Sequence, residues 1–304
     1  MKSTNSVTAI LAAIILINSS CQKNNNSPKD ETQLQASVSQ NAVDEYNVQS
    51  GEQFISADAN TAVAVNPSFS VSGSTNNSII AGAVIDKSQL TAFVKKIKII
   101  YNGDDVLGVT RTGNITVELV SGNSWLNAGA VLKITVDTLK VNYLGKSWIY
   151  NGTCYIKNVS GGLAFIAPDI VVHSMRVNGT VTFDDNTTLT WWSARKNSYH
   201  KNDLSFSSEG DTLINNESCT MGGVNRFGTA FLVEAPQAIV SNATCGFDKP
   251  VAGTRIFTSD NRNATITFGI NENGTSVSNG DCAYGYKVDW TTWSGQNATL
   301  IISY

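Results

Sequence analysis

The chain of 304 residues carries 21 Lys and Arg against 24 Asp and Glu, and charged residues make up 15% of it. This near balance, without a basic run, argues against a nucleic-acid-binding surface, and we expect no nucleic-acid partner. The 24 glycines, together with many Asn, Ser and Thr residues, instead suit short strands joined by turns.

Residues 1–20 have the pattern of a signal peptide. Lys2 precedes an apolar run from Val7 to Ile17. A helix over that run would be about 17 Å long, whereas a bilayer core is about 30 Å thick, so the run is too short to span a membrane. Its length is typical of a signal peptide core, and we predict export.

Cys21 follows directly after Ser19 and Ser20, which is the pattern of a lipoprotein. In such proteins the cysteine becomes the first mature residue and carries acyl chains such as palmitate. The match is imperfect, because Asn18 stands where a branched residue is usual and Ile17 lies one place earlier. The alternative is ordinary cleavage, with Cys21 lost or left as a free thiol. Two or more acyl chains would hold the protein firmly on the outer membrane, at the cell surface or facing the periplasm.

Residues 21–45 are expected to form a flexible tether, because Asn, Ser, Gln and Lys offer little to bury. Within it, Lys29-Asp30-Glu31 resembles the charged export signals of surface lipoproteins in the Bacteroidota, and solvated linker charges are the alternative. Apolar residues at 34, 38, 42 and 46 permit one short amphipathic helix. Residues 46–95 are then a partly ordered extension with the first strands.

Residues 96–304 are predicted to form an all-β domain. Apolar residues alternate with polar ones at Ile115, Val117 and Leu119, which indicates a half-buried strand. Further strand candidates follow at short intervals: 96–101, 147–157, 170–177, 227–234, 263–270, 284–292 and 298–303. Because no long helix is predicted between them, we expect an antiparallel sheet, either a sandwich or an extended meander.

In one predicted strand the alternation of apolar residues shifts by one position. Apolar residues occupy even positions up to Val136 and odd positions from Leu139 onward. A bulge near Asp137-Thr138 is needed to keep the apolar side on the core.

No catalytic motif is present, and no metal or cofactor is expected. His173 alternates with apolar residues and is expected to be a packed, hydrogen-bonded core residue, while His200 is expected in a loop. A glycan hydrolase would need two carboxylates about 5–10 Å apart. The glutamates available for such a pair are Glu118, Glu209, Glu217, Glu234 and Glu272.

Tryptophan provides the one pattern that points to a ligand. Trp191 and Trp192 are adjacent on a predicted strand and therefore point to opposite faces, and so do Trp290 and Trp293. An exposed ring on a sheet can stack on a sugar, whereas a ring on a covered face belongs to the core.

Four cysteines remain after Cys21: Cys154, Cys219, Cys245 and Cys282. An even number in an exported chain favours disulfides, with three connectivities open, and buried free thiols are the alternative.

The segments "GNITVEL", "NGTCYIKNVSGG", "VTFDDNTTLTWWSAR", "NRFGTAF", "CGFDKPVAG" and "GDC" follow one another in an order that resembles a family of uncharacterised β-rich lipoproteins of the Bacteroidota. The resemblance covers roughly residues 96–300. It implies that Cys245, before the Pro-Val turn, pairs with Cys282. Cys154 would then be left to pair with Cys219, without support from the family.

Two departures from the family pattern limit what the resemblance implies. The family has Cys-Asp-Asn where this chain has Cys282-Ala283-Tyr284, so the resemblance does not by itself imply a shared polar site there. Its Asp-Gly-Thr turn is Asp185-Asn186-Thr187 here, and asparagine tolerates the turn. Members of the phylum also O-glycosylate exported proteins at Asp-Ser/Thr-apolar triplets, which makes Thr138 and Thr212 candidate sites.

The sequence therefore predicts a lipid-anchored β protein of the envelope or cell surface that binds or scaffolds rather than catalyses. Its partners would be the membrane and either a glycan or an envelope protein. The alternatives are a glycan binder that uses exposed tryptophans and a secreted glycan hydrolase.

Overall fold

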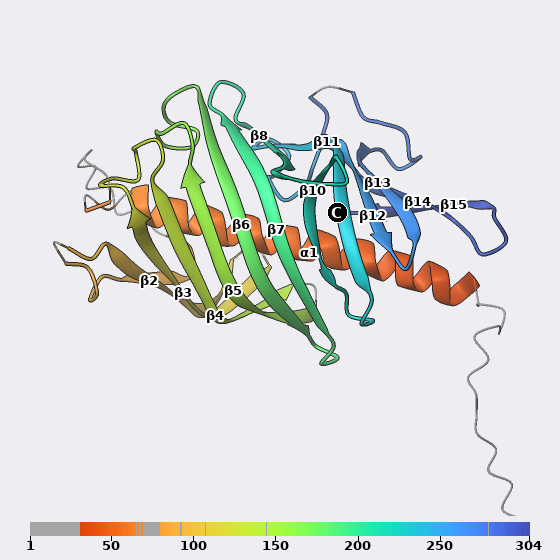
Figure 1. Cartoon of the computed structure of the whole chain (residues 1–304), viewed down its shortest axis with the longest axis horizontal. Helices are drawn as coiled ribbons and strands as arrows, with labels where there is room; N and C mark the ends of the chain where they lie inside the picture. Colours follow the sequence, from red (N-terminus) through yellow and green to blue (C-terminus); the bar gives the residue numbers. More distant parts are fainter. Residues whose placement is uncertain are drawn as a thin grey trace, which may run out of the picture.

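The computed structural model describes residues 31–304, apart from residues 65, 67, 70–79, 92, 107, 144 and 279. The predicted signal peptide, Cys21 and the first part of the predicted tether lie outside the described residues. One helix and fifteen strands make up the described fold, and all the strands belong to one antiparallel sheet (Figure 1).

The elements follow one another with few long connections. Their bounds are α1 Glu31–Ala64, β1 Ala83–Asp86, β2 Lys96–Val106, β3 Val109–Ser121, β4 Val131–Tyr143, β5 Lys146–Asn158, β6 Ile170–Phe183, β7 Thr188–His200, β8 Ser205–Gly210, β9 Thr212–Ile214, β10 Glu217–Val224, β11 Ala230–Asn242, β12 Ala252–Ser259, β13 Arg262–Ile270, β14 Gly285–Thr291 and β15 Asn297–Ser303.

The strands lie in the sheet almost in their chain order, from β1 to β7 and then from β10 to β15. The all-β prediction is confirmed, and of the two architectures proposed the structure has the extended meander rather than the sandwich. Figure 1 shows that this sheet bends around α1, which lies against its concave face. The curvature is accompanied by register shifts in several strand pairs, which is how bulges bend a sheet.

The predicted bulge at Asp137-Thr138 is confirmed. The β4–β5 register shifts between Val136 and Leu139, and Thr138 has a φ of 54°. Gly113 faces this bulge from β3, with a φ of 108°, and a Cβ at that position would lie 2.4 Å from the Thr138 carbonyl oxygen. Glycine is therefore required there, because the backbone of the bulge occupies the space of a side chain.

The N-terminal helix is much longer than predicted. It spans 34 residues, so that the part of the tether from Glu31 to residue 45 is helical and the extension continues the same helix to Ala64. A search for apolar periodicity misses this helix because several of its most buried side chains are polar. Asp44, Glu45 and Glu52 are each less than 5% exposed.

The helix crosses the strands rather than running along them (Figure 1). A helix of this length is about 51 Å long, which corresponds to about ten strands at 4.8 Å spacing. Its acidic residues pair in order with arginines of strands that lie progressively earlier in the sheet: Glu45 with Arg255 on β12 at 2.6 Å, Glu52 with Arg195 on β7 at 3.0 Å, and Asp58 with Arg111 on β3 at 2.5 Å.

The regular order is interrupted at β8. The first half of β7 pairs with β10, whereas its second half, from Arg195 to His200, pairs with β8. β8 also pairs with the end of β11. It is therefore an additional strand between β7 and β11 at one edge of the sheet, beside α1, and we call this edge the widened margin. This widened margin forms one wall of the cavity described below.

Candidate ligand-binding site

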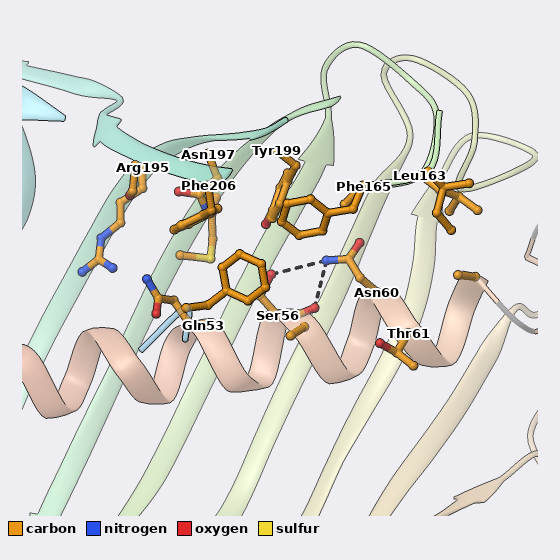
Figure 2. Close-up of a pocket in the computed structure, with 17 residues that line it drawn as sticks. Gln53, Ser56, Asn60, Thr61, Leu163, Phe165, Arg195, Asn197, Tyr199 and Phe206 are labelled. Atoms are coloured by element: carbon orange, nitrogen blue, oxygen red, sulfur yellow. Dashed lines mark hydrogen bonds between the residues drawn. The ribbon is translucent and has the colours of Figure 1, made fainter. Parts of the chain in front are cut away.

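A cavity of about 330 Å³ lies between one flank of α1 and the concave face of β6, β7 and β8. Residues 163–166, between β5 and β6, and Phe247, between β11 and β12, complete its wall. Figure 2 shows the helix on one side of this cavity, Arg195 and Asn197 near one end, and Leu163 at the other. Ile166 is 57% exposed, so the cavity wall reaches the surface on the side of this loop.

The helical wall is formed by residues that share one face of α1. Gln53, Ala57, Asn60, Thr61 and Ala64 follow the spacing of adjacent helical turns. Asn60 has little capacity left for a ligand, because its amide donates to the Ser56 carbonyl at 2.8 Å and its Oδ1 accepts from the indole of Trp125 at 3.1 Å. The alanines leave space, since their side chains end at Cβ.

The loop wall is apolar and aromatic. Phe165 has a φ of 61°, a conformation that is rare for a bulky residue. In this conformation its ring lies 5.1 Å from that of Phe247 and 5.3 Å from that of Tyr199, measured between centroids. At Gly162 an added Cβ would lie 2.1 Å from the Ala167 carbonyl oxygen, so the loop closes on itself only with glycine there.

The sheet wall ends in three buried polar side chains, which we call the polar floor: Arg195, Asn197 and Ser208. They are 1%, 3% and 1% exposed. Arg195 Nε and Nη2, Asn197 Oδ1 and Ser208 Oγ have no hydrogen-bond partner among the residues that the structure describes. Buried polar groups in folded proteins are almost always hydrogen-bonded, so these four atoms are unusual, but each is buried within the wall rather than exposed to the cavity.

Glu52 holds Arg195 in place. Its Oε2 lies 3.0 Å from Arg195 Nη1 and also accepts from the Ser193 hydroxyl at 3.3 Å, while its Oε1 accepts from the Trp191 indole at 2.6 Å. Burial raises the pKa of Glu52, and the Arg195 guanidinium and these hydrogen bonds oppose the shift. The pKa of Tyr199, which also lines the cavity, is raised to about 12 by burial. Tyr199 is therefore a neutral phenol at physiological pH.

The tryptophans do not present the exposed aromatic patch that a glycan would need. Trp191 is 6% exposed, on the concave face, where its ring covers Gly179. Trp192, on the opposite face as predicted, is half-buried across Gly222. Trp290 is 7% exposed in the core, and Trp293 is half-buried with the Arg262 guanidinium 3.2 Å above its ring centroid.

Cys245 and Cys282 form a disulfide, as the resemblance implied. The expected pairing of Cys154 with Cys219 is wrong, since both are buried free thiols. Cys154 lies on the inner face of β5 and Cys219 on β10, and these two strands are not neighbours in the sheet.

His173 is buried on the concave face, as predicted, with its ring 5.1 Å from that of Trp125 and 5.0 Å from that of Tyr199. The expected hydrogen bond is absent, because neither ring nitrogen has a partner in the described part of the chain. His200 lies at the end of β7 rather than in a loop, paired with Ser205.

The candidate carboxylates do not meet at the cavity. Glu118 lies 4.0 Å from Lys96 and Glu209 lies 2.9 Å from Lys196, both as partly exposed ion pairs. Among the described residues that line the cavity there is none of the five glutamates considered for a hydrolase, and no carboxylate at all.

The two candidate O-glycosylation threonines lie in different surroundings. Thr138 is exposed on the β4 bulge, where its hydroxyl donates to Asp137 at 3.0 Å. Thr212 is half-buried at the start of β9, and the neighbouring Asp211 accepts from the Ser174 hydroxyl at 2.5 Å.

No group of three or more metal-ligating side chains occurs within the described residues. In the same part of the chain, α1 is not apolar enough to cross a membrane. No protein-family model, curated protein or solved structure matches this chain. The resemblance to the Bacteroidota lipoproteins therefore stays a prediction.

The polar floor was not predicted from the sequence. One signal was present, because the residues of β7 on the concave face include Ser193, Arg195 and Asn197 where a core strand would have apolar side chains. Taken together, fold and site define a curved single-sheet β protein that holds a helix against its concave face, with a cavity between the helix and the sheet.

Proposed function

We propose that this protein is a lipid-anchored, non-catalytic binding module of the bacterial envelope that holds a small, mainly apolar molecule between α1 and the sheet. The anchoring rests on the N-terminal sequence with Cys21. The binding rests on one observation: a cavity of about 330 Å³ whose wall combines aliphatic and aromatic side chains with polar side chains from α1, β7 and β8. Such a composition is typical of small-molecule sites.

The cavity favours binding over a purely structural role. A structural envelope component would gain stability from filling this space, since empty volume in a core is destabilising. It also favours an apolar ligand over a glycan, because the tryptophans considered for sugar stacking are buried or half-buried.

The binding proposal can be tested by titrating the purified chain with N-phenyl-1-naphthylamine, a neutral dye that fluoresces in apolar surroundings. Ala57→Trp places a large ring at the cavity wall. The matched control is Ala36→Trp on the same helix, because Ala36 is exposed like Ala57 but does not line the cavity. We expect the dye to bind wild type and the control alike, and to bind Ala57→Trp at least tenfold more weakly. Equal binding to both variants, or none to wild type, would contradict the proposal.

The anchoring proposal has its own test, which is metabolic labelling of cells with a tagged fatty acid. Wild type should carry the label and Cys21→Ala should not. Label that persists on Cys21→Ala would show that Cys21 is not the attachment point.

A further inference from the structure

Six turns at one end of the strands form a surface that we call the turn rim. They connect β1 to β2, β3 to β4, β5 to β6, β7 to β8, β11 to β12 and β13 to β14, and their residues are 87–95, 122–130, 159–169, 201–204, 243–251 and 271–284. In an antiparallel sheet alternate connections lie at the same end of the strands, and the turn between β5 and β6 projects at the top of Figure 1.

Each turn of the rim is bonded to the next one along the sheet, through four hydrogen bonds and one disulfide. In order, these links are Lys95 Nζ to the Asn123 carbonyl oxygen, the Gly162 N–H to the Leu126 carbonyl oxygen at 2.9 Å, the Lys201 N–H to the Asp169 carbonyl oxygen at 2.9 Å, the Ala243 N–H to the Leu204 carbonyl oxygen at 3.1 Å, and Cys245 to Cys282. The six turns are therefore one continuous surface rather than separate loops.

Large apolar side chains are exposed along the turn rim. Phe93 is 98% exposed and Ile166 is 57% exposed. The other large apolar side chains exposed in these turns are Val94, Val159, Leu204, Phe247 and Tyr284. In the described parts of the turns at the opposite end of the strands, Phe227 is the one such side chain. Apolar exposure gathered on one side of a protein marks an interaction surface.

The cavity reaches the surface within the turn rim. Residues 163–166 and Phe247 belong to two of the rim turns and also line the cavity, and both Ile166 and Phe247 are exposed. An apolar molecule that enters the cavity here passes between apolar side chains.

The charges of the turn rim nearly cancel. Its turns contain four lysines and five carboxylates: Lys87, Lys95, Lys201, Lys249, Asp169, Asp203, Asp248, Glu272 and Asp281. Neither a polyanion nor a strongly basic partner is therefore favoured. Apolar side chains between balanced charges instead suit a bilayer of zwitterionic lipid, in which the apolar groups insert below the headgroups and lysines extend toward them.

The predicted anchor keeps a bilayer within reach of this surface. Cys21 precedes Glu31, where α1 begins, by ten residues, and an extended chain of that length spans at most about 35 Å. A protein held at this distance needs only a weak second contact to stay on the membrane, because the contact is then made within one assembly. Scattered apolar side chains on six turns can provide such a contact with fluid lipid, which adapts to their shape.

On the basis of the proposed function, we propose that the turn rim lies on the surface of a zwitterionic lipid bilayer, with Phe93 and Val159 inserted among the lipids. In this orientation the cavity opens toward the membrane between Ile166 and Phe247. The small apolar molecule then passes between the bilayer and the cavity without crossing water.

Quenching of a fluorophore by a labelled lipid tests this orientation. The mature protein, with the anchor it carries in the cell, is labelled with the fluorophore NBD at Phe93→Cys or Val159→Cys and reconstituted into phosphatidylcholine vesicles that contain a lipid with a nitroxide near its headgroup. The matched control carries NBD at Phe227→Cys, which is 52% exposed at the opposite end of the strands. Labelled wild type, whose free cysteines are buried, gives the background.

We expect the nitroxide to reduce the fluorescence of both rim fluorophores about twofold or more, and to leave the control nearly unchanged. A second experiment connects this result to the apolar side chains, with NBD at Leu204→Cys. Phe93→Ser/Val159→Ser should reduce its quenching by about half, whereas Leu213→Ser/Phe227→Ser, two exposed positions outside the rim, should not. None of these residues lines the cavity, so binding of N-phenyl-1-naphthylamine in solution should stay the same in both variants.

The outcomes separate the two proposals. Equal quenching at Phe93 and Phe227, stronger quenching at Phe227, or no quenching at either position would overturn the membrane assignment. Quenching that is unchanged in Phe93→Ser/Val159→Ser would overturn it as well. If dye binding persists in those cases, the binding module remains and the turn rim is a surface for a protein partner instead. Absence of dye binding to wild type in solution would refute the proposed function, whatever the vesicles show.

Discussion

The Glu52 carboxylate on α1 lies 3.0 Å from Nη1 of Arg195 on β7, and both side chains are almost completely buried. The pair joins the helix to the middle of the sheet and at the same time orients one wall of the cavity. Taking two charges out of water is costly, so such a pair is stable only because hydrogen bonds from Trp191 and Ser193 complete the environment of the carboxylate.

Removing only one charge of this pair should therefore lower the free energy of unfolding much more than removing both charges. Arg195→Met leaves Glu52 buried and unpaired, and we expect the free energy of unfolding to fall by about 3–5 kcal/mol. In Glu52→Gln/Arg195→Met both charges are gone, and most of this loss should be recovered. Urea denaturation of the two single variants and the double variant measures the coupling. Additive losses would show that the two charges do not interact in the folded state.

The disulfide between Cys245 and Cys282 should support both stability and ligand binding. It joins two loops that are 37 residues apart, and the first carries Phe247 on the cavity wall. Cys245→Ser/Cys282→Ser should lower the free energy of unfolding by about 3–4 kcal/mol, mainly because the unfolded chain gains freedom. It should also weaken dye binding, since the Phe247 loop loses its tether.

Reduction provides the control for that variant. Dithiothreitol should reproduce both effects in wild type and have neither effect in the double-serine variant. If dye affinity is the same in reduced and oxidised wild type, the disulfide does not position the cavity wall.

His173 should make the fold sensitive to mild acid. Burial lowers its pKa to about 4, whereas a histidine in an unfolded chain titrates near 6.5. Between these pH values the unfolded state binds more protons, so the free energy of unfolding decreases as pH falls from 6.5 to 4, by up to about 3 kcal/mol. His173→Gln should lose this part of the pH dependence.

Chemical denaturation at pH 7, 6, 5 and 4 measures it, and His200→Gln is the matched control that should keep the wild-type slope. Burial raises the pKa of Asp44, Glu52 and Asp58, which acts in the opposite direction at low pH. Because both variants retain these carboxyl groups, the difference between their curves isolates His173. Parallel curves for the two variants would contradict the prediction.

The two free thiols should be unreactive in the folded protein. Burial raises the pKa of Cys154, and the negative charge of Glu52 raises it further. Burial also raises the pKa of Cys219. A buried thiol with a raised pKa offers little thiolate for alkylation. Iodoacetamide at pH 8 should modify neither residue in native protein and both in 6–8 M urea, a range that unfolds most domains of this kind. Peptide mapping identifies the sites, and rapid labelling of Cys219 before unfolding would be the contrary result.

Most strands of the sheet could be predicted from short stretches of sequence. Alternating apolar residues and turn-forming pairs define most strands and their order, because both are properties of a few neighbouring residues. The bulge at Thr138 was predictable for the same reason, since the apolar residues change phase between Val136 and Leu139. The disulfide between Cys245 and Cys282 followed only from a resemblance between sequences, not from the spacing of the cysteines.

The long helix and the cavity were decided by tertiary structure. Glu45, Glu52 and Asp58 are ordinary solvent-facing residues in any local pattern, and only arginines on strands far along the chain make their burial favourable. The polar floor arises in the same way, where β8 inserts beside β7 and brings Ser208 next to Asn197. Charge pairing and strand insertion act between residues distant in sequence, so the sequence alone indicated a β protein and the tertiary structure created the cavity beside α1.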